Sequence, residues 1–265
     1  MDVPVQRRIC ILVKAYPQPS HTYGQTVCCA GITDTGEFLR LYPIPYLALK
    51  PDQRFERFDW IEAKIWPSGG RDHRPESHKV DPDSIRIISP KSKRGGHHEL
   101  WLPHVSESFQ ALKDANQGAK RVSLGIVRPD SESVRFITST YSDSAREEKE
   151  TALEMQAQEL LFAEEKKVTI PIPEKLFKYR FRSGNTKHDM TIHDWEVQAA
   201  YYNFKRLYGQ EALDKLNQQY QDTIPYRNLH FIMGTQLSRP KQFMIIGLLR
   251  FGGDIEAIAA QESLF

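Results

Sequence analysis

Carboxylates gather with histidines in two short segments, and these residue types can carry acid–base or charge-stabilising chemistry. The first segment, 72–78, reads Asp-His-Arg-Pro-Glu-Ser-His, and the second, 188–196, ends in Asp194 and Glu196. A carboxylate beside a sugar can stabilise the positive charge that builds up as a glycosidic bond breaks, or can activate water. The catalytic candidates are Asp34, Asp72, Glu76 and Asp194.

Each carboxylate also has a structural interpretation. Asp34 lies in the turn of a predicted hairpin, where Asp commonly bonds to nearby backbone N–H groups. Asp194 lies where a helix is predicted to begin, so it can cap that helix. The 72–78 segment is equally typical of a hydrophilic connection, although loops carry functional residues more often than cores do.

A proline-rich segment from 14 to 24 carries side chains that could wall a pocket for a base. Enzymes that act on a base must extrude it from the stack and hold it against aromatic or apolar groups. The substrate-binding candidates are Tyr16, Ser20, Tyr23 and, from the first carboxylate segment, His78. The alternative is that the tyrosines cap the end of a barrel.

Because the net charge is only +2, any binding of nucleic acid must depend on local clusters of basic residues. One cluster directly precedes Gly95 and Gly96, and such a cationic loop can follow phosphates. A strand predicted over 176–182 would place its three basic residues on one face and three aromatic residues on the other, although a charged edge strand that prevents aggregation has the same pattern. The DNA-binding candidates are Lys14, Arg40, Lys91, Lys93, Arg94, Lys178, Arg180 and Arg182.

The last five residues, Gln-Glu-Ser-Leu-Phe, resemble the pentapeptide with which bacterial proteins bind the sliding clamp. Such a peptide needs an exposed tail, an amide that sets the register and two adjacent apolar side chains that fill a pocket. The clamp-binding candidates are Gln261, Leu264 and Phe265, and Glu262 departs from the pattern, in which leucine is commoner. In the alternative interpretation, the two apolar residues pack on the protein itself.

The sequence predicts no metal site and no cofactor. The three cysteines, Cys10, Cys28 and Cys29, lie in apolar, strand-like runs that are typical of buried thiols. The chain has no Walker loop, no dinucleotide-binding glycine pattern and no nucleophile elbow. None of its histidine and carboxylate sets has a strong metal-ligand spacing.

The elements that must position these residues follow from the hydrophobic periodicity. Strands are predicted at 8–15, 26–32, 37–42, 59–66, 84–88, 122–127, 134–138, 176–182, 229–233 and 242–249. Helices are predicted at 106–115, 144–167, 191–207 and 210–221. Several short strands joined by turns favour a small barrel in the first half.

The predicted fold is therefore α+β. We expect a β-rich, oligonucleotide-binding-fold-like (OB-like) barrel over 1–141, a helical linker over 142–169, an α+β lobe over 170–253 and a tail over 254–265. With 265 residues, 40% of them hydrophobic, the chain can bury a core. No apolar run approaches the roughly 18 residues of a membrane span, and no signal-peptide core follows the first residues. We expect a cytoplasmic protein that does not contact membranes.

The run from 14 to 45 resembles a poorly characterised group of prokaryotic proteins, through motifs that include Ala15-Tyr16-Pro17 and Arg40-Leu41-Tyr42-Pro43-Ile44-Pro45. The later Arg74-Pro75-Glu76, Asp194-Trp195-Glu196 and Met233-Gly234-Thr235 fit the same group. Its N-terminal part is similar to dual OB-fold domains. The resemblance extends to phage-defence DNA glycosylases that remove glucosylated hydroxymethylcytosine, although the signatures of ordinary glycosylases are missing.

Two functional hypotheses follow, and both make DNA the partner. In the first, the protein excises a modified base with a carboxylate and a flipped-base pocket. In the second, the same aromatic and basic residues read DNA without catalysis and the carboxylates are structural. A nuclease is a weaker third hypothesis, because no pair of metal-binding carboxylates is clearly accompanied by a lysine.

Overall fold

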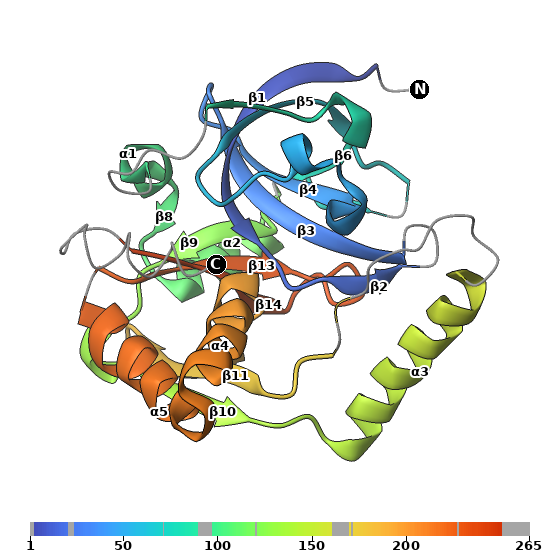
Figure 1. Cartoon of the computed structure of the whole chain (residues 1–265). Helices are drawn as coiled ribbons and strands as arrows, with labels where there is room; N and C mark the ends of the chain where they lie inside the picture. The colour runs from blue at the N-terminus through green and yellow to red at the C-terminus, as the bar shows by residue number, and fades with distance from the viewer. Residues whose placement is uncertain are drawn as a thin grey trace.

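The chain folds into an N-terminal β-barrel and a C-terminal part of helices and sheets, which confirms the predicted α+β class (Figure 1). The computed structural model describes residues 3–20, 24–70, 72–89, 97–119, 121–160, 170, 172–226 and 228–250, without the side chains of 19, 20, 24, 152–160 and 226. None of the helices in the described part of the chain has both the length and the apolar composition needed to cross a membrane.

Five strands close the barrel. In order around it they are β1 (Val5–Lys14), β3 (Gly24–Thr33), β4 (Phe38–Ile44), β6 (Ser77–Val80) and β5 (Trp60–Pro67), and β5 pairs again with β1. Short strands extend it, β2 (Gln18–Ser20) beside β3 and β7 (Arg86–Ser89) beside β5. Closure satisfies the backbone groups that an open sheet would leave at its edges. The barrel is consistent with the expected OB-like fold.

The segment 72–78 is not a single connection, as the sequence suggested, because Ser77 begins strand β6. This strand pairs in parallel with β4, with Arg40 opposite Ser77, and it closes the barrel against β5. Its sequence, Ser-His-Lys-Val, has no apolar alternation, so periodicity alone does not reveal it. The predicted hairpin between β3 and β4 is confirmed.

Two sheets and the helices that follow the barrel form the described C-terminal part. The four-stranded sheet has the order β14 (Phe243–Leu249), β13 (His230–Thr235), β9 (Leu124–Val127), β8 (Val105–Ser106). The three-stranded sheet consists of β10 (Arg135–Ser139), β11 (Leu176–Ser183) and β12 (Thr186–Thr191). The helices are α1 (His98–Trp101), α2 (Phe109–Gln117), α3 (Asp143–Leu160), α4 (Trp195–Tyr208) and α5 (Ala212–Asn217), which continues as a π-helical turn, Gln218–Thr223.

The helix predicted from residue 191 begins only at Trp195, because the preceding residues form strand β12. Gly184 and Asn185 connect β11 to β12, and Gly184 has a φ of 60°. A two-residue connection that begins with glycine at positive φ is a hairpin turn. The alternating polar sequence of β12 conceals this strand.

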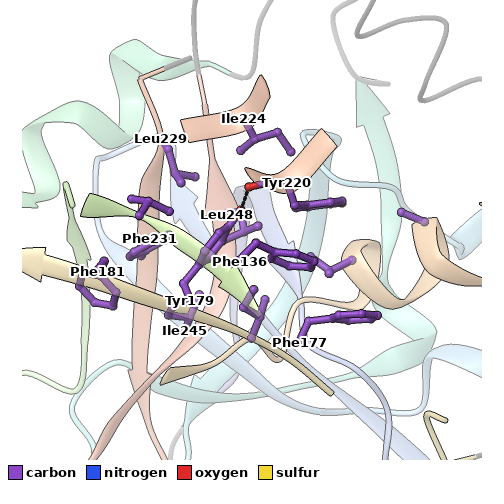
Figure 2. Close-up of a cluster of buried hydrophobic side chains, with 14 of the residues drawn as sticks. Phe136, Phe177, Tyr179, Phe181, Tyr220, Ile224, Leu229, Phe231, Ile245 and Leu248 are labelled. Carbon is purple, nitrogen blue, oxygen red and sulfur yellow. Dashed lines mark hydrogen bonds between the residues drawn. The ribbon is translucent and has the colours of Figure 1, made fainter. Parts of the chain in front are cut away.

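An aromatic core lies where the three-stranded sheet, the four-stranded sheet and the helices meet (Figure 2). Phe136 stacks on Phe177 with ring centroids 5.4 Å apart, and the hydroxyl of buried Tyr179 donates to the carbonyl of Tyr220 at 2.7 Å. A second core fills the barrel, and a third lies between the barrel and the four-stranded sheet. In this third region, a Cβ added to Gly247 would lie 2.5 Å from Val13 Cγ2, so the two parts pack closely.

Candidate functional site

The candidate residues lie in separate places of the fold. One group of them, which we call the seam cluster, lies where the barrel meets the four-stranded sheet. It consists of Arg40, Asp72, Arg74, Glu76, Ser77, His78 and Ser123. The second, the barrel-end cluster, consists of Lys14, Tyr16, Tyr46, Arg57, Asp194, Trp195 and Glu196. The predicted basic strand lies apart from both, on the three-stranded sheet.

Arg40 is buried in the seam cluster, with 2% of the residue exposed. Its Nη1 donates to Ser77 Oγ at 3.1 Å and to Ser123 Oγ at 2.8 Å, and its Nη2 donates to the carbonyl of Ser123 at 3.0 Å. Burial lowers the pKa of the guanidinium. Arg40 therefore ties the barrel to the segment before β9 and presents almost no surface to a DNA phosphate.

The Glu76 carboxylate is occupied by donors of the chain itself. Its Oε1 accepts from the backbone N–H of Ser123 at 2.8 Å and of Leu124 at 3.3 Å, and its Oε2 accepts from Ser123 Oγ at 2.6 Å. Buried polar groups need such partners. The arrangement gives Glu76 a structural role at the start of β9.

Asp72 and Arg74 form an oriented ion pair at the rim of the seam cluster. Arg74 Nε lies 2.8 Å from Oδ1 and Nη2 lies 2.7 Å from Oδ2, while Nη1 donates to the carbonyl of Thr235 at 2.8 Å. The side chain of Asp72 is 13% exposed and that of Arg74 is 11% exposed. Partial burial raises the pKa of the Asp72 carboxyl, but Arg74 outweighs it and the net pKa lies below its ordinary value. Asp72 is thus an ionised, fixed and partly accessible carboxylate.

His78 lies beside this pair in sequence and is partly buried. Its Nδ1 lies 3.0 Å from the carbonyl oxygen of Glu76. A carbonyl can only accept, so this contact assigns the proton to Nδ1 and leaves Nε2 as an acceptor in the neutral ring.

Lys14 and Tyr16 close one end of the barrel. Lys14 Nζ donates to Tyr46 Oη and to the carbonyl of Phe55, both at 3.1 Å, and lies 4.5 Å from the centre of the Tyr46 ring. Tyr16 is 8% exposed and meets Trp195 edge-on, with centroids 6.4 Å apart. These contacts favour the capping interpretation of Tyr16 over a wall for a flipped base.

Asp194 is the N-cap of α4, as one interpretation of the sequence predicted. Its Oδ1 accepts from the backbone N–H of Glu196 at 3.0 Å, and its Oδ2 accepts from that of Leu248 at 2.9 Å. Burial raises the pKa of this carboxyl, to about 7. Asp194 thus joins α4 to β14 and is 1% exposed.

Glu196 offers a second accessible carboxylate at the barrel end. Its Oε2 lies 2.6 Å from Arg57 Nη1, and its side chain is 41% exposed. Burial raises the pKa of the Glu196 carboxyl, but Arg57 outweighs this and lowers it. Arg57 also donates to the carbonyl of Leu248 and so links the barrel to β14.

Asp34 lies exposed in the β3–β4 turn, where its backbone N–H donates to the carbonyl of Arg8 at 3.2 Å. In the described structure, the side-chain acceptor of this turn is Thr33, whose Oγ1 receives the N–H of Glu37 at 2.9 Å. The turn itself is confirmed, and within the described residues Asp34 forms no ion pair that would orient its carboxylate.

The alternation predicted for β11 is confirmed. Phe177, Tyr179 and Phe181 are buried, whereas Lys178 and Arg180 point outward with side chains 33% and 64% exposed. Arg182 is exposed on the same face. Several other candidates lie outside the described residues or side chains: Ser20, Tyr23, Lys91, Lys93, Arg94, Gln261, Leu264 and Phe265.

Two family models match the chain. Residues 105–265 match a domain of unknown function, DUF8757, and residues 5–101 match a second domain of unknown function, DUF8758. The chain belongs to the DUF8757 family. No curated protein matches it. The boundary between the two matched regions falls between α1 and β8, so the DUF8757 region contains both C-terminal sheets.

The sequence did not single out several residues that complete these clusters. Ser123 and Arg57 act through partners far along the chain, and Ser123 lies 83 residues from Arg40. A lone serine or arginine carries no signal for such a partner. In the parts of the DUF8758 and DUF8757 regions that the structure describes, no group of three or more His, Cys, Asp or Glu residues could hold a metal ion. The described cysteines are free, with Cys10 and Cys29 buried and Cys28 partly buried.

Proposed function

We propose that this protein is a DNA glycosylase that excises modified bases, with Asp72 as the carboxylate that faces the sugar. One observation carries the proposal. Asp72 is held by Arg74 through both carboxylate oxygens, is ionised, and remains partly exposed at the rim of the seam cluster. Preorganised charge of this kind stabilises the charge that develops in a transition state.

The chemistry assigns Asp72 one role. When the bond between base and sugar breaks, the sugar acquires positive charge, water adds to the sugar carbon and the base leaves with a proton. A carboxylate whose pKa is lowered is a weak base. Asp72 therefore acts by stabilising the positive sugar, and Arg74 acts by holding Asp72 in position.

The other three carboxylates support this choice. Both carboxylate oxygens of Glu76 and of Asp194 accept hydrogen bonds from the chain itself, so neither carboxylate is free to face a substrate. Asp34 is exposed in a turn and, within the described residues, has no cation that orients it. Of the four candidates, Asp72 alone combines orientation with access.

The substrate follows from the resemblance, which favours DNA with glucosylated hydroxymethylcytosine. The expected base pocket includes Ser20, Tyr23 and His78. The basic residues predicted to bind phosphates and the clamp-like C-terminal pentapeptide both fit a protein that acts on DNA.

The test uses the full-length protein and duplexes with cytosine, hydroxymethylcytosine or glucosylated hydroxymethylcytosine. Free base is measured by mass spectrometry and abasic sites by alkaline cleavage, with and without EDTA. We expect release from the glucosylated duplex in both conditions, and a loss of about 10²–10³-fold in Asp72→Asn. Asp34→Asn, which also removes one carboxylate, is the matched control and should retain activity. Strand cleavage that requires a divalent ion would instead support a nuclease.

A non-catalytic reader of DNA is the second candidate, and one contact favours it. Arg74 also donates to Thr235 of β13, so the Asp72–Arg74 pair bridges the barrel and the four-stranded sheet as a structural pair would. A reader would bind the modified duplex more tightly than the unmodified one and release no base. That outcome would contradict the glycosylase.

A further inference from the structure

The outer face of the three-stranded sheet is strongly basic, and its basic residues come from β10 and β12 as well as from β11. The strand register places Arg135 of β10 directly opposite Arg180, and Lys187 of β12 directly opposite Arg182. Both added residues are exposed. The basic face therefore comprises Arg135, Lys178, Arg180, Arg182 and Lys187.

Within this face, only one strand position carries a carboxylate, Asp189 of β12. Its Oδ2 lies 2.7 Å from Arg180 Nε, and its Oδ1 lies 3.8 Å from Lys178 Nζ. Like charges directly opposite each other on a sheet are destabilising. The face nevertheless pairs Arg135 with Arg180 and Arg182 with Lys187, so its charge costs stability that a purely structural sheet could avoid.

We propose that this basic face binds the phosphate backbone of duplex DNA, without reading the base sequence. Successive outward residues of a strand are roughly 7 Å apart and neighbouring strands about 4.8 Å apart, so the five cations form a two-dimensional grid rather than a line. The choice of DNA rests on the proposed function. The binding face is also separate from the barrel, which carries the proposed catalytic carboxylate Asp72, because β10 and β11 lie across the molecule from it (Figure 1).

The chemistry of the face favours a polyanion over a membrane. The other outward positions are Ile137, Ser139, Leu176 and Thr191, each partly buried. None of the exposed large apolar residues in the described part of the chain lies on this face. A membrane-binding surface would present apolar groups for insertion beside its basic residues. The outward positions hold no Asn or Gln to read an adenine edge, and their arginines and lysines are side chains that bind phosphate oxygens.

Binding is measured by fluorescence anisotropy with a labelled, unmodified duplex over a range of salt concentrations, so that no base excision enters the measurement. Arg180→Glu and Lys187→Glu should weaken binding, and each lost phosphate contact should make the log–log salt slope shallower by about one unit. Lys79→Glu and Arg86→Glu make the same charge change at exposed positions of the barrel and serve as matched controls. They should affect binding much less.

A gain-of-affinity variant avoids ambiguity from misfolding. Asp189→Asn removes the single carboxylate of the face and releases Arg180 and Lys178 from their ion pairs. It should bind the duplex more tightly than the wild type at low salt, and the difference should shrink as salt rises.

The proposal is overturned if the face variants and the barrel controls weaken binding equally, if Asp189→Asn binds no more tightly, or if the protein binds duplex RNA and not DNA. Base release distinguishes this failure from failure of the proposed function. If the face variants weaken DNA binding but no base is released from any duplex, the proposal for the basic face is supported and the glycosylase proposal is contradicted. If base release depends on Asp72 but the face variants leave the salt slope unchanged, the proposal for the basic face is contradicted and the glycosylase proposal stands.

Discussion

Arg74 meets the Asp72 carboxylate side-on, with Nε 2.8 Å from one oxygen and Nη2 2.7 Å from the other. Its third nitrogen donates to the carbonyl of Thr235, so the guanidinium is held from two directions. A guanidinium offers this planar fork, whereas a lysine ammonium is a point charge on a flexible stem. The orientation of Asp72 therefore depends on Arg74 being an arginine.

Arg74→Lys should lower base release by about 10-fold or more, because a carboxylate displaced by even 1 Å loses much of its effect. The expected pH dependence has a definite sign. Arg74 lowers the pKa of Asp72, so the wild type keeps an ionised Asp72 to lower pH, and the acid limb of kcat/KM should move to higher pH in the variant. An unmoved acid limb in Arg74→Lys would contradict the role of Asp72.

The same pair should contribute to folding stability above the pKa that Asp72 has in the unfolded chain, because its folded-state pKa is lowered. This contribution is lost as the pH falls through the folded-state pKa. Urea unfolding of the wild type and Asp72→Asn at pH 7 and pH 3 measures it. The difference in unfolding free energy between the two proteins should be smaller at pH 3, and an equal difference at both values would argue against an ionised Asp72.

Arg40→Met should destabilise the protein by about 3–5 kcal/mol, the range for breaking one side of a buried charged network. The change leaves Ser123 and Glu76 without the cation beside them. Arg86→Met, on exposed strand β7, is the control and should change stability by no more than about 0.5 kcal/mol. Chemical unfolding followed by circular dichroism compares them.

Gly247→Ala should cost about 1–3 kcal/mol, because its Cβ would lie 2.5 Å from Val13 Cγ2 and 2.8 Å from Val13 Cβ. Gly118→Ala provides the control, since its Cβ would have ordinary contacts at 3.5 Å and its φ is −71°. Melting temperatures of the two variants should differ clearly. Equal melting temperatures would mean that the barrel and β14 separate more easily than this contact implies.

Deleting 261–265 should leave base release from naked DNA nearly intact and abolish binding to a purified bacterial sliding clamp. The reason is effective concentration, since a terminal peptide can hold a protein near freshly copied DNA without adding contacts to it. A pull-down with the clamp and a melting curve separate this from the alternative. A lowered melting temperature with no clamp binding by the intact chain would end the recruitment hypothesis.

The sequence predicted strands with a strong apolar pattern well, and it failed where pairing partners supply the stability. Alternation located β11, and the capping pattern located Asp194 at the start of α4. Strands β6 and β12 are short and polar, so nothing local distinguishes them from loops. Burial of Arg40 was equally hidden, because it depends on Ser123, which only the closed fold brings near.

Strands β10 and β11 are neighbours in one sheet, and Ser139 pairs with Leu176 where the chain leaves and re-enters it. The segment 140–175, with α3 in it, thus begins and ends at adjacent points about 5 Å apart. Topologically it is an insertion into a hairpin. Because its two ends lie this close, the pairing of β10 with β11 does not depend on the length of the chain between them, so the exposed turn before α3 is the position at which we would graft a reporter domain.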